Sequence, residues 1–294
     1  MHSSISLRLD DALDALLGAL ELERLADDRF RASPDTLRPL DRIYGGQLLA
    51  QALAAAGSTV TGKAPRSLHA AFVRAGTPGR SLELTVDRVR DGRTTSTRHV
   101  TVLEEGKRLL TAIASFHDGD IEPQVAAPAP AAPPPEEVPL LQDWAAQLPA
   151  DLQEYGRHWI EQPPPVEMRI GEAPSFLGGP PTVAPGATRS HWMRVPRDVG
   201  DDPLRHAALL AYASDFLLMD MVFRAHPGDA GPGLSNGLSL DHAIWFHRPV
   251  RFDRWHLYTQ EALAAVGDRG LARGAVHDTD GRLVATTVQE VLVL

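Results

Sequence analysis

Two segments of the sequence are apolar on nearly every side of the helix that each would form. They are LLAQALAAAG at residues 48–57 and HAALLAYASDFLLMDMVF at residues 206–223. A helix that is apolar all round is buried in a core and does not lie on a surface. Because one short sheet covers only one side of a helix, the pattern predicts an α+β fold in which two sheets join and curl around two central helices.

The sequence around these helices repeats between the halves of the 294-residue chain. In each half a helix, expected over residues 47–58 and 203–224, precedes about four antiparallel strands. The strands are predicted from the alternation of apolar and polar residues, as in SLELTVD. The last hairpins, EEGKRLLTAIASF and DTDGRLVATTVQE, align without gaps, and this alignment pairs Ser115 with Gln289.

A proline- and alanine-rich stretch separates the two halves. It contains QVAAPAPAAPPPEEVP, which holds neither a helix nor the period of a strand. One short helix is expected in the rest of this connection. The chain is therefore expected to have an N-terminal domain at residues 1–117, a linker at residues 118–165 and a C-terminal domain at residues 166–294.

The composition argues against several classes of protein. The formal net charge is -9 at pH 7 and cysteine is absent, which argues against a nucleic-acid partner, a thiol nucleophile and a cysteine-based metal site. The 12 histidines form no H-E-x-x-H or H-x-x-x-H pair, so no metal or other cofactor is expected. The apolar start of the chain carries acidic residues, and no run reaches the roughly 18 apolar residues of a membrane helix. A cytoplasmic protein without a membrane partner is expected.

Several separate motifs, in order along the chain, resemble the bacterial acyl-CoA thioesterase II family. They are RIYGGQLLAQAL, SLHAAFVRAG, YASDFL, LDHAIWFHRP and GRLVATTVQE, and only the proline-rich connection falls outside the resemblance. The resemblance implies two fused hotdog domains, each with a long central helix wrapped by an antiparallel sheet, joined into one continuous sheet. It also implies hydrolysis of medium- to long-chain fatty acyl-CoA, catalytic residues in the C-terminal domain and a homo-oligomer.

The resemblance assigns three catalytic residues. The family's Asp on the second helix falls on Asp215, and its Gln on the last strand falls on Gln289. The family's Thr is replaced by Ser239, which retains a hydroxyl group. Asp215 also stands out by itself, because a carboxylate on the apolar face of a buried helix is costly unless it is well partnered. A structural Asp bonded to backbone or arginine is the alternative interpretation.

Other residues near these motifs have weaker predicted roles. Gly45 and Gly46 begin the first helix, and their N–H groups are expected either to bind an oxyanion or to form a tight turn. Asp220 lies about 140° around the helix from Asp215 and is expected to be solvated or capping. Leu218 and Met219 are candidates for the acyl slot. Candidates for contacts with the phosphates of CoA are Arg248, Arg251 and Arg273.

Two patterns suggest a serine nucleophile, and both are rejected. Ser235 lies in a G-x-S-x-G match, but a glycine-rich loop precedes it and a strand follows, unlike a nucleophile elbow. Ser239, Asp241 and His242 suggest a triad, but alternation along a strand would turn His242 away from the other two. Attack by an oriented water is therefore expected. Two alternatives stay open, a non-catalytic acyl-CoA-binding protein and an enoyl-CoA hydratase of the same fold.

Overall fold

The strands of the protein form one continuous antiparallel sheet. A computed structural model describes residues 2–33, 41–119, 125–180, 186–226 and 237–294. Within them, 12 strands follow the order β1-β2-β4-β5-β6-β3-β10-β13-β12-β11-β8-β7, and β9 pairs with β13. The strands are β1 (Glu23–Ala26), β2 (Arg29–Ala32), β3 (Ala64–Phe72), β4 (Leu82–Asp91), β5 (Thr95–Glu104), β6 (Lys107–His117), β7 (Glu167–Ile170), β8 (Thr188–Arg194), β9 (Gly237–Ser239), β10 (Asp241–Phe246), β11 (His256–Val266), β12 (Arg269–Asp278) and β13 (Leu283–Val293).

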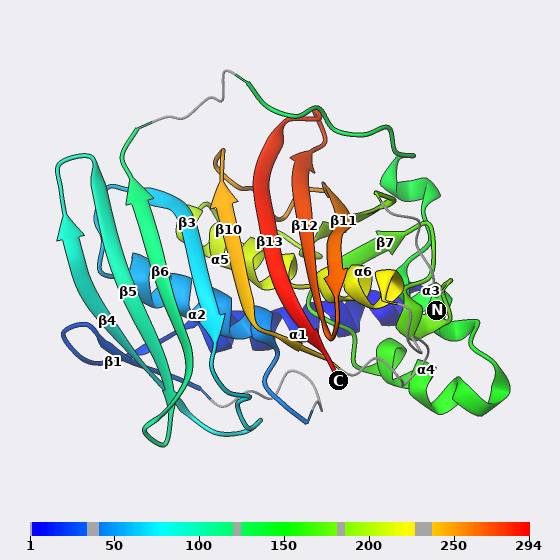
Figure 1. Cartoon of the computed structure of the whole chain (residues 1–294), viewed down its shortest axis with the longest axis horizontal. Coiled ribbons are helices and arrows are strands. Elements are labelled where there is room, and N and C mark those ends of the chain that lie inside the picture. The colour runs from blue at the N-terminus through cyan, green and yellow to red at the C-terminus, as the bar shows by residue number, and fades with distance from the viewer. Residues whose placement is uncertain (1, 34–40, 120–124, 181–185, 227–236) are drawn as a thin grey trace.

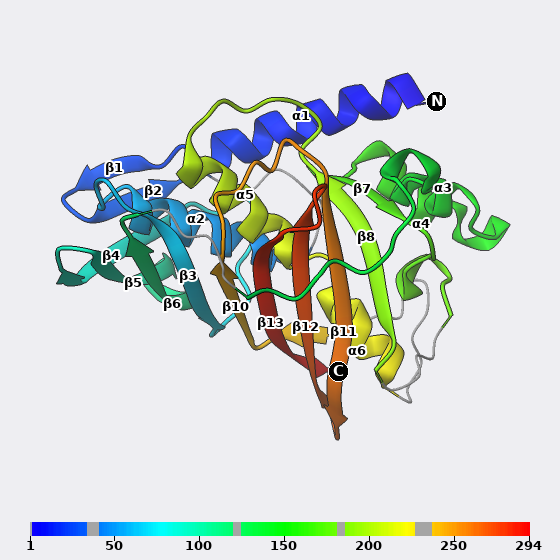
Figure 2. The ribbon, with the colours of Figure 1, turned by 90° about the horizontal axis from the view of Figure 1, so that it is seen from above.

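The helices at the centre of the molecule pack on one face of this sheet. Figure 2 shows α2 and α5 against the sheet, with α1 lying beyond them. The helices are α1 (His2–Leu20), α2 (Gly45–Gly57), α3 (Leu141–Ala146), α4 (Gln153–Glu161), α5 (Pro203–Ser214) and α6 (Leu218–Ala225). Nearly every residue of α2 and α5 is buried, as their all-round apolar sequences predict.

The two halves meet at the centre of the sheet, where β3 lies beside β10 (Figure 1). Leu68 and Ile244 face each other across this junction, and both are fully buried. The predicted α+β fold, two fused hotdog domains with a joined sheet, is therefore confirmed.

The second central helix is broken, although the sequence predicts one helix over residues 203–224. α5 ends at Ser214 and α6 begins at Leu218, with Leu217 in the left-handed region at φ 63°. Side chains from the sheet satisfy the carbonyls that the break frees. Tyr258 Oη donates to the Ser214 carbonyl at 2.8 Å, and Gln260 Nε2 donates to the Phe216 carbonyl at 2.8 Å. Buried carbonyls without such donors would each cost free energy.

Asp220 is buried, so the prediction that it is solvated or capping was wrong. Only 2% of it is exposed, and it forms an ion pair with buried Arg189. The backbone N–H of Ser175 also donates to Asp220 Oδ1 at 3.0 Å. Arg189 Nη2 in turn donates to the Leu217 carbonyl at 3.0 Å. The break shifts the phase of α6, which turns this carboxylate toward a cationic partner on β8.

The repeat contains one inserted residue, so the ungapped alignment was wrong by one position. The first hairpin turns through residues 105–106, whereas the second turns through residues 279–281. A slip of one residue exchanges the faces of a strand. Gln289 therefore corresponds to buried Ala114 and not to half-buried Ser115.

The connection between the halves contains two helices, α3 and α4, where one was predicted. The residues that lead to these helices pass the ends of β12 and β13 (Figure 1), where the Ala127 carbonyl lies 3.1 Å from His277 Nε2. The stretch Pro203–Ala225 has the length and hydropathy of a membrane span, contrary to the expectation that no run does. However, 94% of its most apolar window is buried inside the protein, as in a core helix.

Candidate active site

A cleft of about 470 Å³ opens where the start of α2 meets the break after α5. Strand β9 and the end of β3 form part of its walls. Asp215 and Ser239 line it together with Gly45. Its apolar walls include Ile43, Leu48, Phe72, Phe216, Met219 and Leu238. The cleft therefore combines apolar walls with the Asp215 carboxylate.

The Asp215 carboxylate is held from two sides by hydrogen-bond donors. It is 8% exposed, and the backbone N–H of Gly46 donates to its Oδ2 atom at 2.9 Å. Gln289 Nε2 donates to the Oδ1 atom at 2.9 Å. The carboxylate thus lies at the N-terminus of α2, where the helix dipole favours a negative charge. Its orientation is therefore fixed by its place after α5 and by contacts with α2 and β13.

Gln289 brings the three predicted catalytic residues together. Its side chain is fully buried, and Nε2 donates to Ser239 Oγ at 2.5 Å as well as to Asp215. Both hydrogens of the amide nitrogen are therefore directed at acid and hydroxyl. Since that hydroxyl accepts from Gln289, its own hydrogen is available for another acceptor.

Burial raises the pKa of Asp215 from 3.8 to about 6, because the charged form loses its hydration. The hydrogen bonds from Gln289 and Gly46 act in the opposite direction and limit this rise. The acid is therefore mainly ionised at pH 7, yet it is a much stronger base than an exposed Asp. This is the property that a general base needs near neutral pH.

The two glycines at the start of α2 allow the close approach of the acid. A Cβ atom on Gly45 would lie 2.8 Å from Asp215 Oδ2, and one on Gly46 would lie 2.2 Å from the Tyr212 carbonyl oxygen. The Gly46 N–H is engaged by the carboxylate and does not stand open to an oxyanion, contrary to the expectation for this group. Gly45 remains at the cleft wall.

A bulge between β9 and β10 changes which side chains face the site. Ser239 lies opposite Val291, while Ala243 lies opposite Val288, so four steps along one strand match three along the other. Simple alternation fails across this bulge. His242 consequently lies on the same side as Ser239, and the prediction that it turns away was wrong.

His242 is a site residue that the sequence interpretation missed. It is 1% exposed, with Nδ1 3.3 Å from Gln289 Oε1 and Nε2 2.9 Å from Ser214 Oγ. Burial lowers its pKa to about 4, so the ring is neutral at pH 7. Asp241 is exposed and accepts from the Glu290 N–H, so the three residues of the rejected triad form no relay.

The connection between the halves reaches the cleft, which its proline-rich sequence did not indicate. Trp159 of α4 and Phe176 line the cleft and stack with ring centroids 4.8 Å apart. Of the two candidates for the acyl slot, Met219 lines the cleft, whereas Leu218 is fully buried in the core. An aromatic pair and a methionine therefore form one apolar wall.

The three arginines considered for phosphate contacts lie away from the cleft lining. Arg251 pairs with Asp201, and Arg273 pairs with Glu261. Arg248 lines a separate pocket. The arginines that do line the cleft are Arg42 and Arg74. Ser235 lies outside the described residues.

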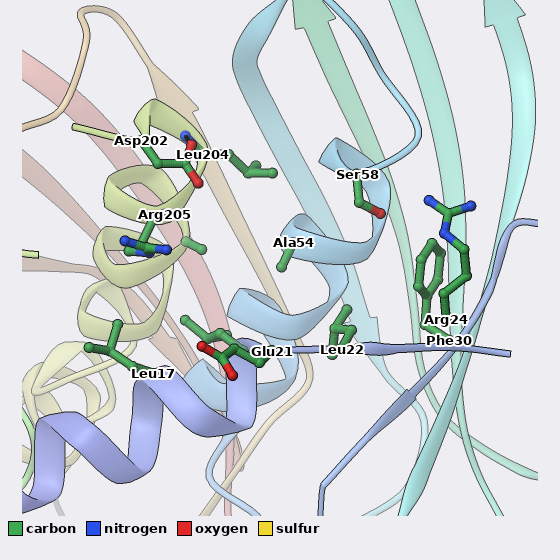
Figure 3. A pocket seen from close by; sticks show the side chains of 12 residues that line it. Leu17, Glu21, Leu22, Arg24, Phe30, Ala54, Ser58, Asp202, Leu204 and Arg205 are labelled. Atoms are coloured by element: carbon green, nitrogen blue, oxygen red, sulfur yellow. Dashed lines mark hydrogen bonds between the residues drawn. The ribbon is translucent and has the colours of Figure 1, made fainter. Parts of the chain in front are cut away.

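Another pocket, of about 400 Å³, lies between the ends of α1 and α2 and the start of α5 (Figure 3). Its lining mixes leucines with the charged residues Glu21, Arg24, Asp202 and Arg205. None of the predicted catalytic residues lies in this lining. Over the part of the chain that the structure describes, no group of three or more His, Asp or Glu is arranged to hold a metal ion.

Comparisons with known proteins cover both halves of the chain. Residues 168–292 match the family model described as Acyl-CoA thioesterase, and residues 33–117 match the one described as Acyl-CoA thioesterase N-terminal domain. The chain is 33% identical over 293 residues to Acyl-CoA thioesterase 2 of Haemophilus influenzae, covering 97% of this chain and 99% of that protein.

Two further relatives are also described as acyl-CoA thioesterases. The chain is 33% identical over 280 residues to Acyl-coenzyme A thioesterase 8 of Homo sapiens, covering 92% of this chain and 86% of that protein. The crystal structure of an acyl-CoA thioesterase II, TesB2, from Mycobacterium marinum superposes with a TM-score of 0.74 at 30% identity, covering 95% of this chain and 97% of that one. Similarity to proteins with one named activity therefore extends along nearly the whole chain.

Proposed function

This chain belongs to the acyl-CoA thioesterase II family and is a thioester hydrolase. We propose that Asp215, Gln289 and Ser239 orient the water that attacks the thioester. The proposed substrate is medium- to long-chain fatty acyl-CoA. The observation that carries the proposal is the Gln289 amide, which bridges a buried carboxylate and a hydroxyl at the cleft.

In the proposed reaction Asp215 acts as general base. It accepts a proton from water while the water oxygen bonds to the thioester carbonyl carbon. Collapse of the tetrahedral intermediate breaks the carbon–sulfur bond, and the departing thiolate takes the proton back from Asp215. A thiol has a pKa of about 8.5, so the leaving group needs little help. Ser239 directs its own hydrogen to the water and holds it in line, and Gln289 holds Ser239 and Asp215 in place, because both of its amide hydrogens are directed at them.

The negative oxygen of the intermediate needs donors of its own. Gly45 lies at the start of α2 beside the acid, where backbone N–H groups and the helix dipole favour a negative charge. We assign this role to Gly45. Gly46 instead fixes the carboxylate through its N–H.

The apolar walls of the cleft suit a hydrocarbon chain. Phe72 and Phe216 lie near the acid, and Met219 and Trp159 extend the same apolar surface. Each methylene buried there contributes about 0.8 kcal/mol to binding, which favours medium and long chains over short ones. Arg42 and Arg74 at the cleft are the proposed contacts for the anionic CoA moiety.

The domain division is part of the proposal. The boundaries 1–117, 118–165 and 166–294 are supported by the match of separate family models to residues 33–117 and 168–292. The cytoplasmic location and the homo-oligomer stay predictions. Light scattering on the purified protein measures its molar mass in solution and tests the second of them.

One assay tests the activity. Purified protein is mixed with acyl-CoA esters of increasing chain length, and released thiol is detected with a disulfide reagent. Thiol release that is lost in Asp215→Asn supports the proposal. Tight ester binding without release would instead indicate a non-catalytic binder, and loss of enoyl absorbance without thiol would indicate a hydratase. Single-turnover hydrolysis in oxygen-labelled water tests for a mixed anhydride on Asp215, because an anhydride that water opens at the Asp215 carboxyl carbon would leave label in the protein.

A further inference from the structure

The buried His242 contacts the catalytic amide but not the cleft. It lies on β10 near the centre of the sheet, and its two ring nitrogens face Gln289 Oε1 and Ser214 Oγ. It is absent from the cleft lining, so it does not reach substrate directly. Its position indicates a role that is exerted through Gln289.

The orientation of the Gln289 amide determines whether the site works. With Nε2 toward Asp215 and Ser239, the amide donates to both. A flipped amide would place its carbonyl oxygen against the carboxylate, which is repulsive. The favourable orientation leaves Oε1 buried and facing His242, so this oxygen requires a donor from the ring.

The proton on the His242 ring is fixed by this requirement. A neutral imidazole carries one N–H, so donation from Nδ1 to Gln289 leaves Nε2 as an acceptor. The Ser214 hydroxyl lies 2.9 Å from Nε2 and can donate to it. Ser214 Oγ is also 2.8 Å from the Ala211 carbonyl, but donation there would require an Nε2–H ring and would leave Gln289 Oε1 without a donor.

We propose that His242, held by Ser214 as the Nδ1–H tautomer, is a positioning residue that locks the Gln289 amide with its NH₂ group toward the acid and the hydroxyl. This inference rests on the proposed function of Asp215, Gln289 and Ser239. His242 takes no proton from water or substrate. It acts on the rate because a misoriented amide would neither stabilise the carboxylate nor hold the Ser239 hydroxyl that orients the water.

The test compares two variants of similar size, His242→Asn and His242→Leu. Asn can place an N–H where Nδ1 lies, whereas Leu cannot donate. His242→Leu is expected to lower kcat roughly 10- to 100-fold with KM changed less than about threefold, and His242→Asn to recover most of the loss. Equal losses in the two variants would overturn the proposal. Circular dichroism and thermal melting confirm that both are folded.

A second measurement separates positioning from a general structural effect. If His242 acts through Gln289, then His242→Leu introduced into Gln289→Ala should lower kcat by less than about threefold more. A full additional loss in that background would contradict the proposal.

The tautomer itself is read from the ¹⁵N shifts of labelled histidine, with His242→Asn identifying the signal. A protonated Nδ1 and a bare Nε2 are expected, and the reverse would refute the assignment. This readout is independent of activity. A wild-type protein that hydrolyses no acyl-CoA would defeat the proposed function and still leave the tautomer testable.

Discussion

The internal repeat gives the molecule two corresponding pockets, and only one of them has the catalytic groups. Phe72 lines the cleft, and Phe246 takes the equivalent place in a smaller pocket of about 170 Å³. The register supports this equivalence, since each phenylalanine pairs with the matching position of its last strand. Pro65 takes in the smaller pocket the position that Ser239 takes in the cleft. Both halves also carry a register shift directly after these two positions.

The first half lacks all three proposed catalytic groups at once. Ala114 stands where the second half has Gln289, and α2 ends at Gly57 without a carboxylate comparable to Asp215. In the first half, Gly57 packs closely against the Leu204 side chain, since a Cβ atom on Gly57 would lie 2.4 Å from it. This apolar contact takes the place of the contact between Gly46 and the acid in the cleft. The repeated backbone therefore carries catalytic groups at one end of the α2–α5 pair and an apolar contact at the other.

The largest effect is expected from Asp215→Asn, which removes the acid that distinguishes the cleft. Loss of a general base lowers kcat by roughly 10²- to 10⁴-fold. Thiol release from acyl-CoA is the measurement. The matched control is Asp241→Asn, an exposed position whose oxygen can still accept from the Glu290 N–H. Unchanged activity in Asp215→Asn would remove the proposed base from the mechanism.

Gln289→Ala gives the cleft the residue that the first half has at Ala114. It is expected to lower kcat about 100-fold, because the acid and the hydroxyl lose their shared donor. The pKa of the acid should also rise, since Gln289 lowers it in the native protein. Glu290→Gln changes the neighbouring, more exposed side chain and serves as the control. A variant as active as wild type would mean that the amide is only structural.

The comparison also separates what the sequence can predict from what it cannot. The buried helices and the α+β fold follow from all-round apolarity and strand alternation, which are local properties. The break after α5 was missed because the donors that satisfy its carbonyls, Tyr258 and Gln260, lie 44 residues further along the chain. Asp220 was misjudged for the same reason, since its partner Arg189 is on another element.

The candidate site shows the same division. The resemblance supplied Asp215, Gln289 and Ser239, and the structure brings all three within hydrogen-bond distance around one amide. A buried carboxylate on an apolar helix was a physical signal visible in the sequence. His242 was not visible, because a one-residue bulge reversed its face and nothing in the local sequence marks that bulge.

Gly46→Ala tests whether α2 must approach the acid as closely as it does. The new Cβ would lie 2.2 Å from the Tyr212 carbonyl oxygen and 2.5 Å from the Tyr44 ring, so backbone must move. A loss of roughly 1–3 kcal/mol in unfolding free energy is expected, together with about tenfold in kcat. Gly18→Ala, in α1 with nothing within 4 Å, should instead stabilise by about 0.5–1 kcal/mol. Denaturant titration measures both, and equal responses would show that the contact is not tight.

The pH dependence of kcat/KM should reflect the burial of Asp215, which has no counterpart in the smaller pocket. Burial raises the pKa of Asp215 to about 6, and the ionised form is the base. Activity should therefore be constant above this value and fall about tenfold for each pH unit below it. His242, with a pKa lowered to about 4, remains neutral over most of this range. The absence of a limb near 6 would mean that the acid is not desolvated in the free enzyme.

The smallest effect is expected from a substitution in the wall that the connection adds to the cleft. The smaller pocket has no such wall. Trp159 stacks on Phe176 at the lining, so Trp159→Ala should lengthen the apolar groove. Long acyl chains should then gain over short ones by about fourfold for each additional methylene that becomes buried. The ratio of kcat/KM along a chain-length series is the measurement, and Trp245→Ala, on the exposed side of β10, is the control. An unchanged ratio would place the acyl chain along another wall, because removing an indole that the chain touches must alter the number of methylenes it buries.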